Sequence, residues 1–291
     1  MDSSPSDPRR DLTADPDDPA AAACYKAELR RRGSADHFAV IACIHGNLEA
    51  LEAVFADIDR REIPRVVCLG DMVGIGPNPV ECVDLVFERC DWSLRGHYED
   101  ALVKDVIWSA TRALKTLEWS RDLLRPRVMY GTRKSARWRR LTSLPERWKE
   151  GDREFVHGSP RDPVVDYLHP CCFGEYDKLQ ECLDSISHVL FCGHSHMPFA
   201  VVREIDGEQE LVEIEAVDGA TFELSPTRKA IVNVGSVGKP RDRDARACYV
   251  EVCEEVVTWH RIEYDVEETI RRMHAVPQID RRLAESLRAG L

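Results

Sequence analysis

The chain has 291 residues, of which 43% are hydrophobic, enough for one large core or two small ones. Its net charge of −12 argues against a protein that coats DNA or RNA by general electrostatic attraction. The sequence lacks an apolar run of about 18 residues, the length that a membrane-spanning helix needs. The polar N-terminus does not have the apolar stretch of a secretion signal. We therefore expect a cytoplasmic protein with no membrane partner and no broad nucleic-acid binding.

The cysteine content fits this expected location. The eleven cysteines are odd in number, have apolar neighbours and form no C-x-x-C pair. We expect most of them to be reduced, buried thiols rather than disulfides or zinc-ribbon ligands.

Composition predicts where the folded part of the chain begins. Residues 1–34 are rich in Asp, Pro, Ser, Ala and Arg and lack an apolar period. We predict a disordered tail for them, because such a segment cannot bury enough apolar surface to fold. For residues 35–291 we predict a single domain.

Strands alternate with helices in the first part of this domain. The apolar runs 38–44 and 65–70 are typical of buried strands, and 92–95 predicts a short third strand. Residues 48–61 have helical apolar spacing, and 79–89 predicts a second helix that begins with proline. This β-α-β-α-β order predicts a parallel sheet with right-handed crossovers.

The later elements change in character. We predict mostly helix for residues 99–150, strands at 154–157 and 188–192, antiparallel strands and hairpins over 200–262 with turns at Asp206-Gly207 and Asp218-Gly219, and a closing helix over 265–286 interrupted near Pro277. Residues 125–149 hold nine Lys or Arg and one acidic residue. This basic segment has two open interpretations: a solvated helical face, or a basic wall near an anionic substrate.

Metal-capable side chains follow five of the predicted strands. They are Cys43 and His45, Asp71, His97, His157, and His194 with His196. Each signal is weak alone, since a single histidine at a strand end is more often a structural, hydrogen-bonded residue. Ligand sites in open α/β sheets form at the carboxyl edge of the strands. Five such strand ends in register therefore predict a ligand site at that edge.

Six segments, in this order, resemble the calcineurin-like metallophosphoesterase superfamily and its small prokaryotic branch. They are 44–51, 68–71, 74–79, 157–162, 193–196 and 233–242. The resemblance covers residues 38–290. It implies an α/β fold, the four-layer α/β/β/α sandwich of that superfamily. It also implies hydrolysis of a small phosphorylated substrate, which would be a phosphomonoester, a phosphodiester or a nucleotide.

The resemblance further implies a dinuclear metal site with its ions about 3.5–4 Å apart, at which water attacks phosphorus in line. By matched position, His45, Asp71 and His196 would hold the first metal and Asp71 would bridge. His157 and His194 would hold the second metal. We also predict that Asn47 and Arg95 bind the substrate.

Three positions depart from the family pattern. Cys43 stands where the family has a ligand Asp, His97 where it has a ligand Asn, and Tyr98 where it has the catalytic His. In one interpretation the site is retuned: Cys43 and His97 coordinate, and the softer ligands favour Zn²⁺ or Fe²⁺, with Mn²⁺ or Ni²⁺ as further candidates. Tyr98 would then hold the catalytic position as a hydrogen-bond donor and a poor proton shuttle near neutral pH.

In the other interpretation the site has decayed. The protein would then be a pseudoenzyme that binds a phosphorylated ligand or a partner protein without turnover. We favour the retuned site, because two of the three replacements can themselves coordinate a metal.

Overall fold

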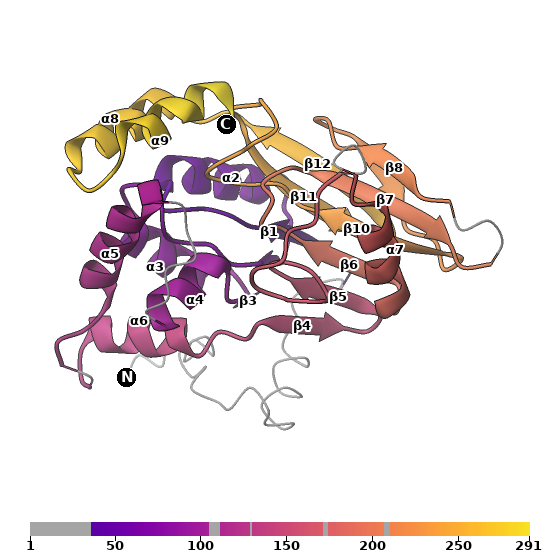
Figure 1. Cartoon of the computed structure of the whole chain (residues 1–291), viewed down its shortest axis with the longest axis horizontal. Coiled ribbons are helices and arrows are strands. Elements are labelled where there is room, and N and C mark those ends of the chain that lie inside the picture. Colours follow the sequence, from indigo (N-terminus) through magenta and orange to yellow (C-terminus); the bar gives the residue numbers. More distant parts are fainter. Residues whose placement is uncertain (1–35, 105–110, 129, 171–173, 207–209) are drawn as a thin grey trace, which may run out of the picture.

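The computed structural model describes residues 36–104, 111–128, 130–170, 174–206 and 210–291. The predicted tail, residues 1–34, lies outside the described residues. The described part forms two six-stranded sheets with helices on the outer faces (Figure 1). This arrangement confirms the predicted four-layer α/β/β/α sandwich. Among the helices that the structure describes, none is long and apolar enough to cross a bilayer.

The first sheet has the strand order β3-β2-β1-β11-β12-β9. Its strands are β1 (His37–Ile41), β2 (Val66–Cys68), β3 (Trp92–Ser93), β9 (Thr221–Glu223), β11 (Ala247–Cys253) and β12 (Val256–Ile262). The first three are parallel, as predicted, and α2 (Leu48–Arg60) and α3 (Pro79–Arg89) connect them. The other pairings in this sheet are antiparallel.

The second sheet has the strand order β4-β5-β6-β10-β7-β8. Its strands are β4 (Arg147–Glu150), β5 (Arg153–Val156), β6 (Val189–Cys192), β7 (Phe199–Glu204), β8 (Val212–Glu215) and β10 (Arg228–Asn233). Strands β5, β6 and β10 are parallel, and the remaining pairings are antiparallel. Each sheet is therefore mixed.

Two details of the second sheet differ from the sequence expectations. β4 lies in a region predicted to be mostly helical, and its Lys149 faces Glu154 of β5 with a 3.0 Å ion pair. Such cross-strand pairs stabilise a strand that sequence periodicity does not identify. The turn at Asp218-Gly219 joins β8 to β9, which belong to different sheets, so it does not close a hairpin. Of the turn predicted at Asp206-Gly207, Gly207 lies outside the described residues.

Amphipathic helices cover both sheets (Figure 1). The outer face of the first sheet is covered by α2 and α3 and by five further helices. These are α4 (His97–Lys104), α5 (Thr111–Leu124), α6 (Arg133–Thr142), α8 (Val266–Ala275) and α9 (Arg281–Glu285). The interruption near Pro277 falls between α8 and α9, as predicted. On the second sheet lies α7 (Tyr176–Ser185). The two sheets enclose a further core, in which Phe155 and Phe191 stack at 5.1 Å between ring centres.

The basic segment 125–149, of which Met129 lies outside the described residues, contacts the protein itself. Arg137 of α6 donates two hydrogen bonds, of 2.5 and 2.6 Å, to Asp84 of α3. Arg140 donates to the carbonyl of Phe87 at 2.9 Å. These contacts favour the interpretation as a packed and solvated helical face over that of a basic wall near a substrate.

Candidate metal centre

Seven metal-capable side chains lie at the ends of strands from both sheets. Cys43 and His45 follow β1, Asp71 follows β2, His97 begins α4 after β3, His157 follows β5, and His194 and His196 follow β6. Parallel strands present their carboxyl ends at one edge of a sheet. The two packed sheets therefore bring these residues together, although they are far apart in the sequence.

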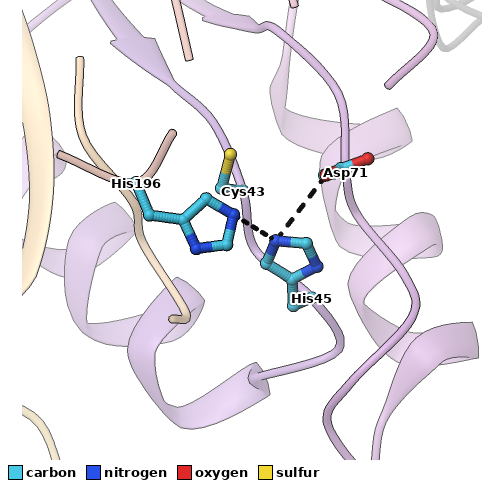
Figure 2. Close-up of side chains that lie close together, drawn as sticks. All are labelled: Cys43, His45, Asp71 and His196. Atoms are coloured by element: carbon cyan, nitrogen blue, oxygen red, sulfur yellow. Dashed lines mark hydrogen bonds and ion pairs between the residues drawn. The ribbon is translucent and has the colours of Figure 1, made fainter. Parts of the chain in front are cut away.

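One group of potential ligands consists of Cys43, His45, Asp71 and His196 (Figure 2). All four are buried, and their potential ligand atoms lie within 4.8 Å of one another. The Nε2 atoms of His45 and His196 are 2.9 Å apart. The Nε2 atom of His45 is 3.7 Å from Oδ2 of Asp71.

A second group consists of Asp71, His97 and His194, whose potential ligand atoms meet the same 4.8 Å limit. His157 lies against this group: its Nε2 atom is 3.0 Å from Nδ1 of His194 and 3.2 Å from Oδ2 of Asp71. Asp71 belongs to both groups. The two candidate metal positions are therefore adjacent and share one carboxylate.

Backbone carbonyls fix the orientation of the imidazole rings. The Nδ1 atoms of His45, His157 and His196 lie 3.2, 2.9 and 2.5 Å from the carbonyl oxygens of Val73, Leu69 and Lys239. A carbonyl can only accept, so each Nδ1 carries the proton and each Nε2 presents a lone pair. His194 is turned the other way, with Nε2 donating to the Val165 carbonyl at 3.1 Å and Nδ1 free to coordinate. Carbonyl partners of this kind orient the histidine ligands of metal sites.

These residues fit a bound cation. The contact between His45 and His196 brings nitrogen lone pairs to within 2.9 Å of each other, and a cation between them would remove the repulsion. Oδ2 of Asp71 is buried, and it lies 3.2 Å from Nε2 of His157 and 3.7 Å from Nε2 of His45. A buried carboxylate is costly unless it is compensated, and a metal ion at this point would compensate it.

Burial sets the charge state of the centre. Burial lowers the pKa of His45 to about 4 and that of His194 to about 2, so both rings are neutral at pH 7 and able to coordinate. Burial and the nearby charge of Asp71 raise the pKa of the Cys43 thiol well above its usual value. Coordination by Cys43 would therefore release a proton.

The N-terminus of α4 holds Asp71 in place. Oδ1 of Asp71 accepts a 2.8 Å hydrogen bond from the backbone N–H of Tyr98. The buried carboxylate of Glu99 accepts from the N–H groups of Asp71 at 2.7 Å and Gly96 at 2.9 Å. A Cβ atom on Gly96 would lie 2.4 Å from Oδ1 of Asp71, so only glycine allows this approach. Glu99 was not predicted as a site residue, although a glutamate at the third helical position is a capping signal.

Five of the clustered residues hold a left-handed backbone. Cys43, His45, Asp71, His194 and His196 have φ angles of 55°, 54°, 56°, 63° and 62°. This region is disfavoured for residues with a side chain, and such strain gathers at functional sites.

Tyr98, which the resemblance places at the position of the family's catalytic His, is packed into the helix-side core. Its side chain is 8% exposed, and its ring meets that of His45 edge-on at 5.0 Å. The ring occupies space that Gly74 leaves open, since a Cβ there would lie 2.1 Å from it. Burial raises the pKa of Tyr98, so the phenol keeps its proton and can only donate a hydrogen bond at neutral pH.

The two predicted substrate-binding residues have other partners. Asn47 caps α2 by accepting from the N–H of Ala50 at 3.2 Å, and its amide donates to the carbonyl of Gly238 at 3.0 Å. Arg95 donates to the carbonyl of Thr142 at 2.9 Å and pairs with Glu146 at 3.4 Å. These contacts orient both side chains, and substrate binding by Asn47 and Arg95 stays a prediction.

Two residues near the centre carried no prediction. The ring of Tyr167 stacks on His194 with 3.8 Å between ring centres, and its hydroxyl interacts with the side chain of Arg241. Arg241 lies in the segment 233–242 that carries the resemblance, but the sequence alone assigns it no role. Tyr167 lies in no motif, and only the tertiary structure brings it to the site.

Comparison with known proteins agrees with this fold. Residues 37–255 match the calcineurin-like phosphoesterase superfamily domain. The uncharacterized protein MJ0912 of Methanocaldococcus jannaschii is 33% identical over 248 residues, which are 81% of this chain and 90% of that protein. The chain belongs to the calcineurin-like phosphoesterase superfamily, which confirms the resemblance found in the sequence.

Two solved structures share the architecture. The crystal structure of a metallophosphoesterase from Sphaerobacter thermophilus is 30% identical, with a TM-score of 0.73, and the match covers 88% of this chain and 99% of that one. The hypothetical protein PH1004 from Pyrococcus horikoshii OT3 is 18% identical, with a TM-score of 0.63 and coverage of 88% and 98%. The second comparison supports the fold alone.

Proposed function

We propose that this protein is a cytoplasmic, metal-dependent phosphoesterase with a dinuclear centre that acts on a small phosphorylated substrate. The substrate would be a phosphomonoester, a phosphodiester or a nucleotide. The observation that carries the proposal is the membership of Asp71 in two adjacent groups of potential ligands. A shared carboxylate between two cation positions is the arrangement that two-metal hydrolysis of phosphoesters requires.

In this proposal each group of side chains holds one ion. Cys43, His45, Asp71 and His196 form the first position, and Asp71, His97, His157 and His194 form the second. A thiolate and several imidazoles are borderline-soft ligands that favour Zn²⁺ or Fe²⁺ over Mg²⁺, with Mn²⁺ or Ni²⁺ less preferred. When bound, such ions polarise the phosphoryl oxygens and lower the pKa of water.

The chain's own residues orient the potential metal ligands. The carbonyl contacts of the histidines fix which nitrogen faces the centre. Glu99 accepts from the backbone N–H of Asp71, and the N–H of Tyr98 in α4 donates to the carboxylate of Asp71. Tyr98 supplies at most a hydrogen bond, because its phenol stays protonated. The leaving group therefore departs without a strong proton donor at this position, which favours substrates with stable leaving groups.

The pseudoenzyme remains the second candidate. The residues at the two replaced ligand positions favour the retuned enzyme. Cys43 belongs to one group of potential ligands and His97 to the other. Loss by drift would not be expected to keep coordinating side chains at both positions.

Hydrolysis of bis-p-nitrophenyl phosphate and p-nitrophenyl phosphate with Zn²⁺, Fe²⁺, Mn²⁺, Ni²⁺ and Mg²⁺ tests the proposal. We expect metal-dependent turnover by the native chain, two metals per chain by elemental analysis, and loss of both in Asp71→Asn. The matched control is Asp177→Asn, which changes an exposed carboxylate on α7. A native chain without turnover, beside an active Cys43→Asp, His97→Asn, Tyr98→His triple variant, would instead establish the pseudoenzyme.

A further inference from the structure

The segment 233–242 is bound directly to the first group of potential ligands. The hydroxyl of Ser236 and the N–H of Gly238 both donate to the carbonyl of Cys43, at 2.8 and 3.0 Å. The N–H of Arg241 donates to the carbonyl of His196 at 3.2 Å. The ring of His196 donates back to the carbonyl of Lys239 at 2.5 Å. The backbone of Arg241 is therefore fixed beside the candidate metal centre.

The side chain of Arg241 differs from its neighbours in its partners. Nζ of Lys239 donates a 2.9 Å hydrogen bond to the hydroxyl of Ser286, and Asp242 forms an ion pair with Arg261 of β12. The guanidinium of Arg241 instead meets the hydroxyl of Tyr167, whose ring stacks on His194. Arg241 thus links His196 of the first group, through its backbone, to His194 of the second group, through Tyr167.

The positive charge of Arg241 is exposed to solvent. The residue is exposed, and within the described ranges no carboxylate forms an ion pair with it. Its backbone N–H lies 3.2 Å from the carbonyl oxygen of His196, which places this cation beside the centre. A fixed, accessible cation beside a metal centre attracts an anionic substrate.

We propose that Arg241, oriented by Tyr167, binds the phosphoryl group of the substrate at this centre. The inference rests on the proposed function and adds the residue that recognises the anion. A guanidinium offers planar N–H donors that match two phosphate oxygens. Tyr98 cannot supply this charge, because its phenol is neutral and its ring is packed against His45 and in the space beside Gly74. Arg241 thereby provides the cationic contact at a site that lacks a histidine at the family's catalytic position.

Calorimetric titration of inorganic phosphate into the Zn²⁺-loaded and Mn²⁺-loaded protein tests this assignment. We expect Arg241→Gln to weaken phosphate binding by roughly 10-fold or more, the effect of removing a charged hydrogen-bond donor. Arg241→Lys should recover part of the affinity, because it keeps the charge but loses the planar donors. Tyr167→Phe keeps the ring on His194 and should weaken binding by a smaller factor.

Arg243→Gln is the matched control, since it removes an exposed cation two positions further along the chain. It should leave phosphate affinity within about 2-fold of the native value, the size of effect expected for an exposed surface charge. Metal content and thermal midpoint should stay unchanged in all four variants. The KM for p-nitrophenyl phosphate should rise with the phosphate Kd in Arg241→Gln.

Equal losses in Arg241→Gln and Arg243→Gln would overturn the assignment, because general electrostatics would then explain both. It would also be overturned by unchanged phosphate affinity in Arg241→Gln, or by a metal-loaded native chain that does not bind phosphate. The proposed function fails separately, through absent metal-dependent turnover in a native chain whose phosphate binding still depends on Arg241.

Discussion

At the scale of single residues, the candidate centre is built from side chains on unfavourable backbone. Each left-handed residue that is not glycine costs about 1–2 kcal/mol, and five lie together here: Cys43, His45, Asp71, His194 and His196. Their sum is a large fraction of the stability of an ordinary domain. Surrounding hydrogen bonds hold this backbone geometry. For example, the N–H groups of Cys43 and His45 donate to the carbonyls of Gly70 and Asp71, at 3.0 and 2.8 Å.

The thiol of Cys43 provides a direct test of metal binding at the first position. Cobalt bound to a thiolate gives a sulfur-to-metal charge-transfer absorption in the near ultraviolet, which nitrogen and oxygen ligands do not give. We expect this absorption in the Co²⁺-loaded native protein and its loss in Cys43→Ser. The exposed Cys253 supplies the control, since Cys253→Ser should leave the band intact. A band that survives in Cys43→Ser would exclude Cys43 as a ligand.

Tyr98 gives a second prediction at this scale. Because its buried phenol does not ionise near pH 7, Tyr98→Phe should lower kcat for p-nitrophenyl phosphate by no more than about 10-fold, the effect of one hydrogen bond. Tyr98→His should raise kcat for alkyl phosphates, whose leaving groups need a proton, by about 100-fold or more. The ratio of alkyl to aryl hydrolysis measures the change. Near-complete loss of aryl hydrolysis in Tyr98→Phe would show that the phenol has a larger role than its environment allows.

At the scale of elements, α2 is anchored to the first sheet by a buried carboxylate. Asp57 is 4% exposed and accepts 2.7 Å hydrogen bonds from the hydroxyl of Tyr249 on β11 and from Nε of Arg61. Burial alone would raise the pKa of Asp57, but these bonds outweigh it and the pKa is lowered. The N-cap of this helix is Asn47, two positions after His45, so this anchor also supports the segment that carries part of the centre.

We expect Asp57→Asn to lower the free energy of unfolding by about 2 kcal/mol at pH 7, the typical value of hydrogen bonds to a charged group. The folded state binds the proton of Asp57 less tightly than the unfolded chain does. Its stabilising contribution is therefore present above the unfolded pKa of about 3.9 and is lost as pH falls through the lower folded value. Urea unfolding at pH 7 and near pH 3 measures both.

The control for this prediction is Asp59→Asn on the same helix, where the carboxylate is exposed and pairs with Arg89. An exposed pair contributes only about 0–1 kcal/mol, so a small effect is expected. A difference between the native chain and Asp57→Asn that does not shrink at low pH would contradict the titration argument.

The elements also show how far the sequence could predict the structure. Helix α3 was predicted with its observed bounds, because proline marks its start and apolar spacing its length. β4 and the passage from β8 to β9 between sheets were not predicted, because strand periodicity does not reveal which strand will be the partner. At the site, residues next to glycine at strand ends could be predicted, whereas Tyr167 and Glu99 depend on packing between distant segments.

At the scale of the whole molecule, the candidate centre draws on both sheets. Cys43, His45 and Asp71 follow strands of the first sheet, and His157, His194 and His196 follow strands of the second. A ligand that binds only the folded chain stabilises it by about 4 kcal/mol when present at 1,000 times its Kd. A cation at this position would therefore stabilise the packing of one sheet on the other.

Removal of metal with a chelator should accordingly lower the thermal midpoint of the protein. About 4 kcal/mol corresponds to roughly 8–16 °C in a domain of this size class. Differential scanning calorimetry with and without chelator, followed by return of Zn²⁺, measures the shift and its reversal. Asp71→Asn should show no response to the chelator. An identical midpoint in the native chain before and after chelation would argue against metal binding between the sheets.

The contact between His45 and His196 joins positions 151 residues apart in the sequence. The eight cysteines that the structure describes are free thiols, so within the described residues no covalent bond closes so long a loop. Coordination at the His45–His196 contact would close it reversibly, and closing a long loop restricts the unfolded chain, as a disulfide does. Under our proposal, the availability of metal would then govern how long the protein resists proteolysis, independently of whether substrate is present.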